Sequence, residues 1–218
     1  LDDVFTLAHE MGHAIHSYLS SHTQKPIDSK YVIFVAEVAS TCNEVLLVKH
    51  LLANTTDKKE RAYLINHFLE QFRGTVYRQT MFAEFELWMN EHAEKGETLT
   101  ADMMCDAYYD LNKKYFGDGM TVDRLISVEW ARIPHFFYNF YVFQYATGFS
   151  AAVAIANRIL TEGKPAVEDY IKFLSAGSSM DPISVLKIAG VDMTTAQPVN
   201  DALKLFNELI DEMAALAE

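Results

Sequence analysis

The chain has 218 residues, of which 50% are hydrophobic and 22% are charged, a balance that allows a sizeable core and excludes a disordered chain. The 30 Asp and Glu against 18 Lys and Arg give a formal net charge of −12 without a basic cluster, so we expect neither a nucleic-acid nor a membrane partner. With 9 Gly and 5 Pro, a β-sandwich or barrel is not expected.

Apolar residues recur at three- and four-residue spacing along most of the chain, which predicts a mostly α-helical fold. Thr100 and Asp181 are expected to cap helices, and Pro182 follows Asp181 at a first helical position. Residues 122–132 give no clear pattern, and Tyr31–Val35 is the one β-rich stretch, so strands are at most a minor element. In chain order, we expect helices over about 4–20, 31–53, 58–95, 100–117, 134–160, 182–190 and 198–217.

The organisation of the chain indicates a single domain over residues 1–218. Its start at Leu1, eight residues before the motif described next, suggests a fragment of a longer protein that lacks an upstream half. Cys42 and Cys105 are too few for a disulfide framework, so we expect free thiols in a reducing, cytoplasmic setting. The apolar run 136–156 contains polar residues and is expected to be a buried helix rather than a membrane span.

The segment from His9 to His13 has the form H-E-x-x-H. Residues four apart share one helix face, so His9 and His13 can present ring nitrogens to one Zn²⁺. Glu10 is the expected general base for a water whose pKa zinc lowers towards about 7. Apolar neighbours are expected to form the buried side of this helix, and Gly12 indicates a close approach of another element. These neighbours are Val4, Leu7, Ala8, Met11, Ala14, Ile15 and Leu19.

A catalytic zinc site needs a third protein ligand. Leu19 excludes the form with a third histidine six residues after His13, and His22 would reach only by bending back. Glu37 and Glu44 are better candidates, because they stand in an apolar stretch of the second predicted helix, seven residues apart on one face. One can bind the metal while the other orients a ligand histidine.

These residues resemble the oligoendopeptidase F branch of the thimet-oligopeptidase-like zinc metallopeptidases. The resemblance rests on 9–16 and 34–37, covers essentially the whole chain, and includes a branch-specific stretch over 133–148. It implies a helical zincin-type catalytic domain with one Zn²⁺ and with Glu37, 28 residues after His9, as third ligand. Glu44 matches a further family glutamate, and His16 matches a position whose role looks structural.

The aromatic stretch from Ile133 to Tyr145 is expected to form one helix opened by Pro134. Tyr138 and Tyr145 then lie seven residues apart on one face, with Tyr141 close to it. A zinc peptidase needs a donor for the oxyanion of the attacked carbonyl, and a phenol supplies one at neutral pH. The resemblance implies that His135, Tyr138 and Tyr145 take this role, with Tyr141 as an alternative to Tyr138.

The sequence therefore predicts a zinc-dependent endopeptidase domain whose partners are oligopeptide substrates and the upstream half of the same enzyme. The preference for short or unfolded peptides is implied by the resemblance. An alternative is a non-catalytic helical domain with a structural or vestigial metal site. The acidic pair Glu84 and Glu86 is expected to be a solvated face, and His67 an ordinary helix residue.

Overall fold

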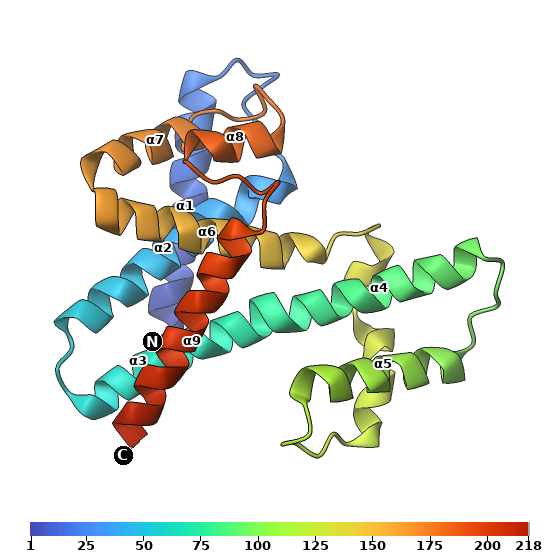
Figure 1. Cartoon of the computed structure of the whole chain (residues 1–218). Helices are drawn as coiled ribbons and strands as arrows, with labels where there is room; N and C mark the ends of the chain where they lie inside the picture. Colours follow the sequence, from blue (N-terminus) through green and yellow to red (C-terminus); the bar gives the residue numbers. More distant parts are fainter. Residues whose placement is uncertain (218) are drawn as a thin grey trace. The chain divides into compact units, whose positions relative to one another are not determined.

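The computed structural model describes residues 1–217. These residues form α-helices and shorter helical segments without a β-strand, so the mostly α-helical prediction is confirmed (Figure 1). The helix expected from about Tyr31 begins at Ile33, so the β-rich stretch Tyr31–Val35 forms no strand. The α-helices are α1 (Asp2–Thr23), α2 (Ile33–Asn54), α3 (Lys58–Phe72), α4 (Arg78–Glu94), α5 (Ala101–Phe116), α6 (Phe143–Glu162), α7 (Lys164–Leu174), α8 (Pro182–Ile188) and α9 (Gln197–Ala217).

The chain divides into two compact units. Unit 1 contains Leu1–Phe72 and the residues from Thr147 onward, and unit 2 contains Arg73–Ala146. The expected single catalytic domain over 1–218 stays a prediction. Within residues 1–217, no helix combines the length and the apolar composition that a bilayer crossing requires.

In unit 1, α1 packs along α2 with their backbones in close contact. A Cβ atom on Gly12 would lie 2.5 Å from Ser40 Cα and 2.8 Å from the Ala39 carbonyl oxygen, so the predicted close approach is confirmed. This contact decides which face of α1 is buried: Phe5, Gly12 and His16. The predicted buried face was wrong, because the helix turns Gly12 toward α2 and thereby leaves apolar side chains exposed. Exposed are Val4, Leu7, Met11, Ala14 and Ile15, while Ala8 and Leu19 are half-buried.

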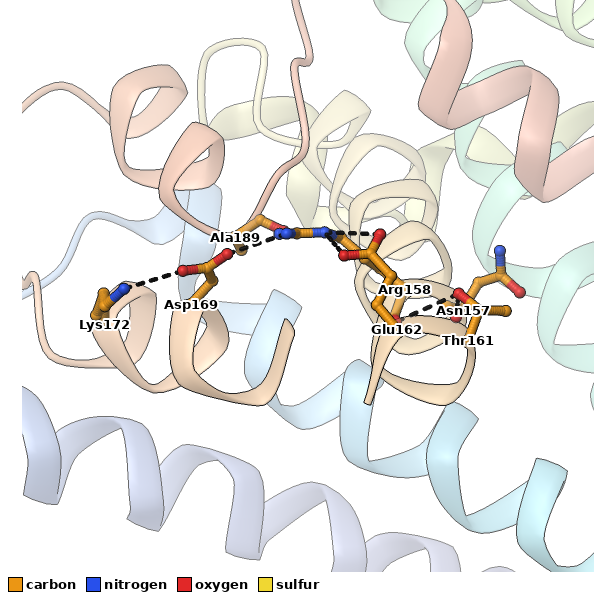
Figure 2. A network of polar contacts seen from close by, with 7 residues as sticks. All are labelled: Asn157, Arg158, Thr161, Glu162, Asp169, Lys172 and Ala189. Atoms are coloured by element: carbon orange, nitrogen blue, oxygen red, sulfur yellow. Dashed lines mark hydrogen bonds and ion pairs between the residues drawn. The ribbon is translucent and has the colours of Figure 1, made fainter. Parts of the chain in front are cut away.

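Arg158 holds the helices α6, α7 and α8 of unit 1 together (Figure 2). Its guanidinium donates to Glu162 on α6, to Asp169 on α7 at 3.0 Å, and to the carbonyl of Ala189 after α8 at 2.9 Å. Asp169 also accepts from Lys172 at 3.0 Å. Because charged hydrogen bonds are the stronger ones, this network fixes α7, a helix that the sequence patterns did not predict.

Unit 2 is built from α4, α5 and the 3-10 segment Arg124–Arg132. Its core contains Phe85 and Tyr108, and the Tyr108 hydroxyl donates to the buried Glu129 at 2.7 Å. The predicted helix over 134–160 was wrong in its first part. Pro134–Phe137 is a 3-10 turn, Asn139 and Phe140 have positive φ, and α6 begins only at Phe143.

The predicted caps are confirmed. The Thr100 hydroxyl accepts the backbone N–H of Met103, and Asp181 Oδ1 accepts that of Ser184 at 3.0 Å. Both side chains satisfy a donor that the first helical turn leaves without a partner.

Candidate functional site

The two histidines of the H-E-x-x-H motif lie one turn apart on α1 and meet a carboxylate from α2. His9 Nε2 lies 3.2 Å from Glu37 Oε2, and His13 Nε2 lies 3.5 Å from the same oxygen. The three donor atoms are all within 4.8 Å of one another. Ligands at about 2.0–2.1 Å around a tetrahedral zinc ion stand roughly 3.3 Å apart, so these residues fit the predicted ligand set.

Neighbouring polar groups hold the three donors in place. Glu44 Oε1 lies 2.6 Å from His9 Nδ1, which leaves Nε2 of the same ring directed at Glu37. Ser40 Oγ donates to Glu37 Oε2 at 3.2 Å. Such outer contacts orient metal ligands and set the tautomer of a histidine. Glu44 thus makes the contact expected of the second carboxylate.

The electrostatics of this group favour a positive charge between the helices. The hydrogen bonds that the His9 ring donates to Glu37, first, and to Glu44 raise the pKa of His9 to about 10, against the opposing effect of burial. The bond to His9 in turn lowers the pKa of Glu37. Two carboxylates therefore face one imidazole, and either a proton or a divalent cation can balance their charge.

A third helix supports the group from behind. Gln71 on α3 donates from Nε2 to Glu44 Oε2 at 2.5 Å, which extends the hydrogen-bonded chain from His9 through Glu44. Gln71 Oε1 and His67 Nε2 are buried and have no partner among the described residues. Both residues line a pocket of about 260 Å³ together with His9 and Glu44. The pocket offers polar groups from several side chains and is large enough for water molecules.

The remaining motif residues have distinct surroundings. Glu10 follows His9 on α1 and is exposed. His16 is fully buried, stacks on Tyr31 with ring centroids 3.6 Å apart, and has a pKa that burial lowers to about 4. His22 binds the Tyr18 carbonyl of its own helix. His16 therefore has a packing role, and His22 is not part of the donor group.

The predicted oxyanion residues form an aromatic cluster in unit 2. The Tyr145 hydroxyl lies 3.2 Å from His135 Nε2, and Tyr141 stacks on His135 with ring centroids 5.7 Å apart. Tyr138 meets His135 edge-on at 6.0 Å and is 59% exposed. The residues come together, but not on one helix: the left-handed backbone at Asn139 separates Tyr138 from α6.

Two polar residues of these surroundings were missed by the sequence patterns. Gln71 gave no signal, because its partner Glu44 lies 27 residues away. Glu86 was wrongly expected to face solvent; it is 2% exposed and accepts the Phe140 N–H at 2.7 Å. The apolar residues Phe82 and Phe85, four and one positions earlier, were the signal that Glu86 lies on the buried face of α4.

Known proteins are similar to this chain over nearly its whole length. The family model described as Peptidase family M3 matches residues 1–205. Oligopeptidase PepF of Bacillus subtilis (strain 168) is 58% identical over 216 residues, which are 99% of this chain and 32% of that protein. The chromosomal oligoendopeptidase F of Lactococcus lactis subsp. cremoris is 47% identical over 218 residues, 100% of this chain and 36% of that protein. The chain thus spans about a third of the length of these curated relatives.

A solved structure has the same fold. The crystal structure of oligoendopeptidase-F from Enterococcus faecium superposes with a TM-score of 0.89 at 48% identity, and the match covers 100% of this chain and 39% of that one. The resemblance to oligoendopeptidase F is confirmed. Since the family model also matches nearly the whole length, this chain belongs to peptidase family M3.

Proposed function

We propose that this chain carries the catalytic centre of a zinc-dependent endopeptidase that hydrolyses peptide bonds in short or unfolded peptides. The observation that carries the proposal is the convergence of two imidazoles and one carboxylate beside an exposed glutamate. Two histidines and a glutamate are a known catalytic zinc set, which leaves a fourth position open. Membership of a peptidase family and relatives named oligopeptidases support the same reaction class.

His9, His13 and Glu37 would hold the ion. Bound zinc supplies Lewis acidity, which polarises a peptide carbonyl and makes water a stronger acid. The Glu10 carboxylate takes the proton of the attacking water and returns it to the nitrogen of the leaving amine. Glu44 keeps the His9 ring in the tautomer whose Nε2 is available to the metal.

The aromatic cluster is assigned to the oxyanion and to substrate binding. The Tyr145 hydroxyl donates to the oxygen of the attacked carbonyl. His135 is assigned the orientation of that hydroxyl through the 3.2 Å contact. The exposed Tyr138 is assigned a second contact to the substrate, and Tyr141 is the alternative.

The proposal concerns a chain that spans about a third of its relatives' length. We infer that the rest of such a protein supplies much of the substrate channel. The 218 residues alone are therefore expected to bind zinc but to cleave peptides weakly or not at all. Free thiols at Cys42 and Cys105 support a reducing, cytoplasmic setting.

The substitution Glu10→Gln, made in a full-length protein that contains this chain, tests the assigned base. Zinc content is expected to stay unchanged, while the rate of cleavage of a fluorogenic oligopeptide falls by about 10²–10⁴-fold, the usual contribution of a general base. Glu60→Gln, at an exposed position of α3, is the matched control and should cleave like the parent.

Unchanged cleavage by Glu10→Gln would remove Glu10 from the mechanism. A parent protein that binds zinc tightly and cleaves no peptide would favour the alternative of a non-catalytic domain with a structural metal.

A further inference from the structure

The backbone of the aromatic cluster contains two consecutive left-handed residues. Asn139 has φ 51° and Phe140 has φ 58°. Asparagine tolerates this region, but a bulky residue such as phenylalanine is an outlier there, because its Cβ crowds the neighbouring carbonyl oxygen. Such a conformation persists only where surrounding contacts impose it, and it is frequent at functional sites.

That contact comes from Glu86 on α4. Its Oε1 accepts the backbone N–H of Phe140 at 2.7 Å, and its side chain is 2% exposed. Burial raises the pKa of Glu86, and the bond from Phe140 partly offsets this rise. A carboxyl group is costly to bury, so its position beside an N–H group that no helical carbonyl can reach indicates a specific role.

The two flanks of this turn are fixed by a different force. Ile133 and Val142 are buried in the core of unit 2, and Phe136 packs on Phe82 and Phe85. Between these anchors the chain leaves the core: Phe137 is 84% exposed and Phe140 40% exposed. The Glu86 bond thus acts on the stretch that apolar packing does not hold.

This stretch joins the two halves of the aromatic cluster. His135 and Tyr138 precede the left-handed pair, and Tyr141 and Tyr145 follow it. A change in the two φ angles swings one half against the other, which would alter the 3.2 Å contact between Tyr145 and His135. The backbone angles of the turn therefore set the direction of the hydroxyl groups.

We propose that Glu86 is a positioning residue for the aromatic cluster of unit 2: its carboxylate holds the left-handed turn at Asn139 and Phe140 and so aligns His135 with Tyr145. The inference rests on the proposed function, because it assumes that these side chains act on substrate. It assigns a role to a residue that, within residues 1–217, contacts the turn and not the candidate metal ligands. Since the alignment matters most when charge develops on the carbonyl oxygen, its loss lowers kcat more than it raises KM.

The first test measures the turn itself by amide hydrogen exchange in the full-length protein. Glu86→Met removes the acceptor at similar size, Glu86→Gln keeps a carbonyl acceptor, and Glu84→Met removes an exposed carboxylate of the same helix as a control. Exchange of the Phe140 amide is expected to rise at least about tenfold in Glu86→Met and to stay unchanged in the other two variants. A protected amide in Glu86→Met would overturn the proposal.

If Glu86→Met does not fold, the parent protein still decides this point. Its Phe140 amide must exchange more slowly than the random-coil rate, although the residue is 40% exposed. Exchange at the random-coil rate would overturn the proposal without any variant.

The second test measures function in the same variants at equal zinc content. Glu86→Met is expected to lose about 10- to 100-fold in kcat with a small change in KM, and Glu86→Gln is expected to restore most of it. Equal kcat in Glu86→Met and the parent would overturn the positioning role, as would a Glu86→Gln variant as slow as Glu86→Met. A parent without peptidase activity would refute the proposed function instead. The exchange experiment would still test the contact between Glu86 and Phe140, because it does not depend on activity.

Discussion

At the scale of single residues, Gly12 sets the spacing of the candidate metal site. An added Cβ would meet backbone atoms of Ser40 and Ala39, which cannot move unless α2 moves. His13 follows Gly12 on α1, and Glu37 lies three residues before Ser40 on α2. The contact that needs a glycine therefore also fixes the distance between the donors of the two helices.

We expect Gly12→Ala to lower the free energy of unfolding by up to about 2 kcal/mol, because the overpacking cost of about 1–3 kcal/mol outweighs the roughly 1 kcal/mol that alanine gains in a helix. Zinc affinity should fall with it, since the helices must separate. Denaturant titration and zinc titration measure both effects. Gly74→Ala is the control, because its Cβ would meet no atom within 4 Å. A Gly12→Ala variant with parental stability and zinc affinity would contradict the argument.

The second residue-scale prediction concerns His16 and pH. Burial lowers its folded-state pKa from 6.5 to about 4, so between these values the unfolded chain binds a proton that the folded chain does not. Stability is therefore lost as the pH falls through this window. From pH 7 to pH 5 the loss attributable to His16 is about 2 kcal/mol. His16→Phe should lose correspondingly less over this range in denaturant titrations; equal losses would contradict the assignment.

At the level of the helices, three of them build the site, and α3 contributes a hydrogen bond to Glu44 of α2. Gln71→Met removes the amide donor to Glu44 while keeping the length of the side chain. We expect zinc affinity to weaken by up to about tenfold, the lower end for an outer contact of a metal ligand, as measured by competition with a chromophoric chelator. In a Glu44→Gln background the same substitution should have little further effect.

Gln197→Met is the matched control. It removes the hydrogen bond of 2.7 Å that the Gln197 side-chain amide donates to the Asp201 carboxylate on α9, and neither residue belongs to the donor group. Equal zinc affinities of Gln71→Met and Gln197→Met would show that α3 does not support the site.

At the scale of the whole molecule, the donors come from α1 and α2, so metal binding must stabilise unit 1. Zinc at 100 times its dissociation constant adds about 2.7 kcal/mol to the folded state. For a chain of this size the melting temperature should then rise by roughly 5–10 °C, and excess chelator should reverse the rise. Glu37→Gln should abolish most of this shift, and Glu44→Gln less of it. The opposite ranking would reassign the third ligand.

Features that depend on the spacing of nearby residues could be predicted from the sequence. Helical periodicity predicted most helices, and the four-residue step from His9 to His13 predicted two rings on one face, because both follow from the geometry of the helix itself. The spacing left Glu37 and Glu44 as candidates for the third ligand, and the family resemblance favoured Glu37. Even α7 had a local signal in Ala166, Tyr170 and Phe173, which share a buried face.

Features that depend on residues far away in the chain could be seen only in the folded structure. The buried face of α1 follows from the contact of Gly12 with Ser40. At the break after Tyr138, the Phe140 N–H binds Glu86, which lies 54 residues earlier in the chain. An apolar or aromatic pattern states how strongly a segment tends to be helical. It does not predict which neighbouring element will supply a buried hydrogen-bond acceptor or a backbone surface for packing. Those contacts determine which helix face is buried and where a helix begins.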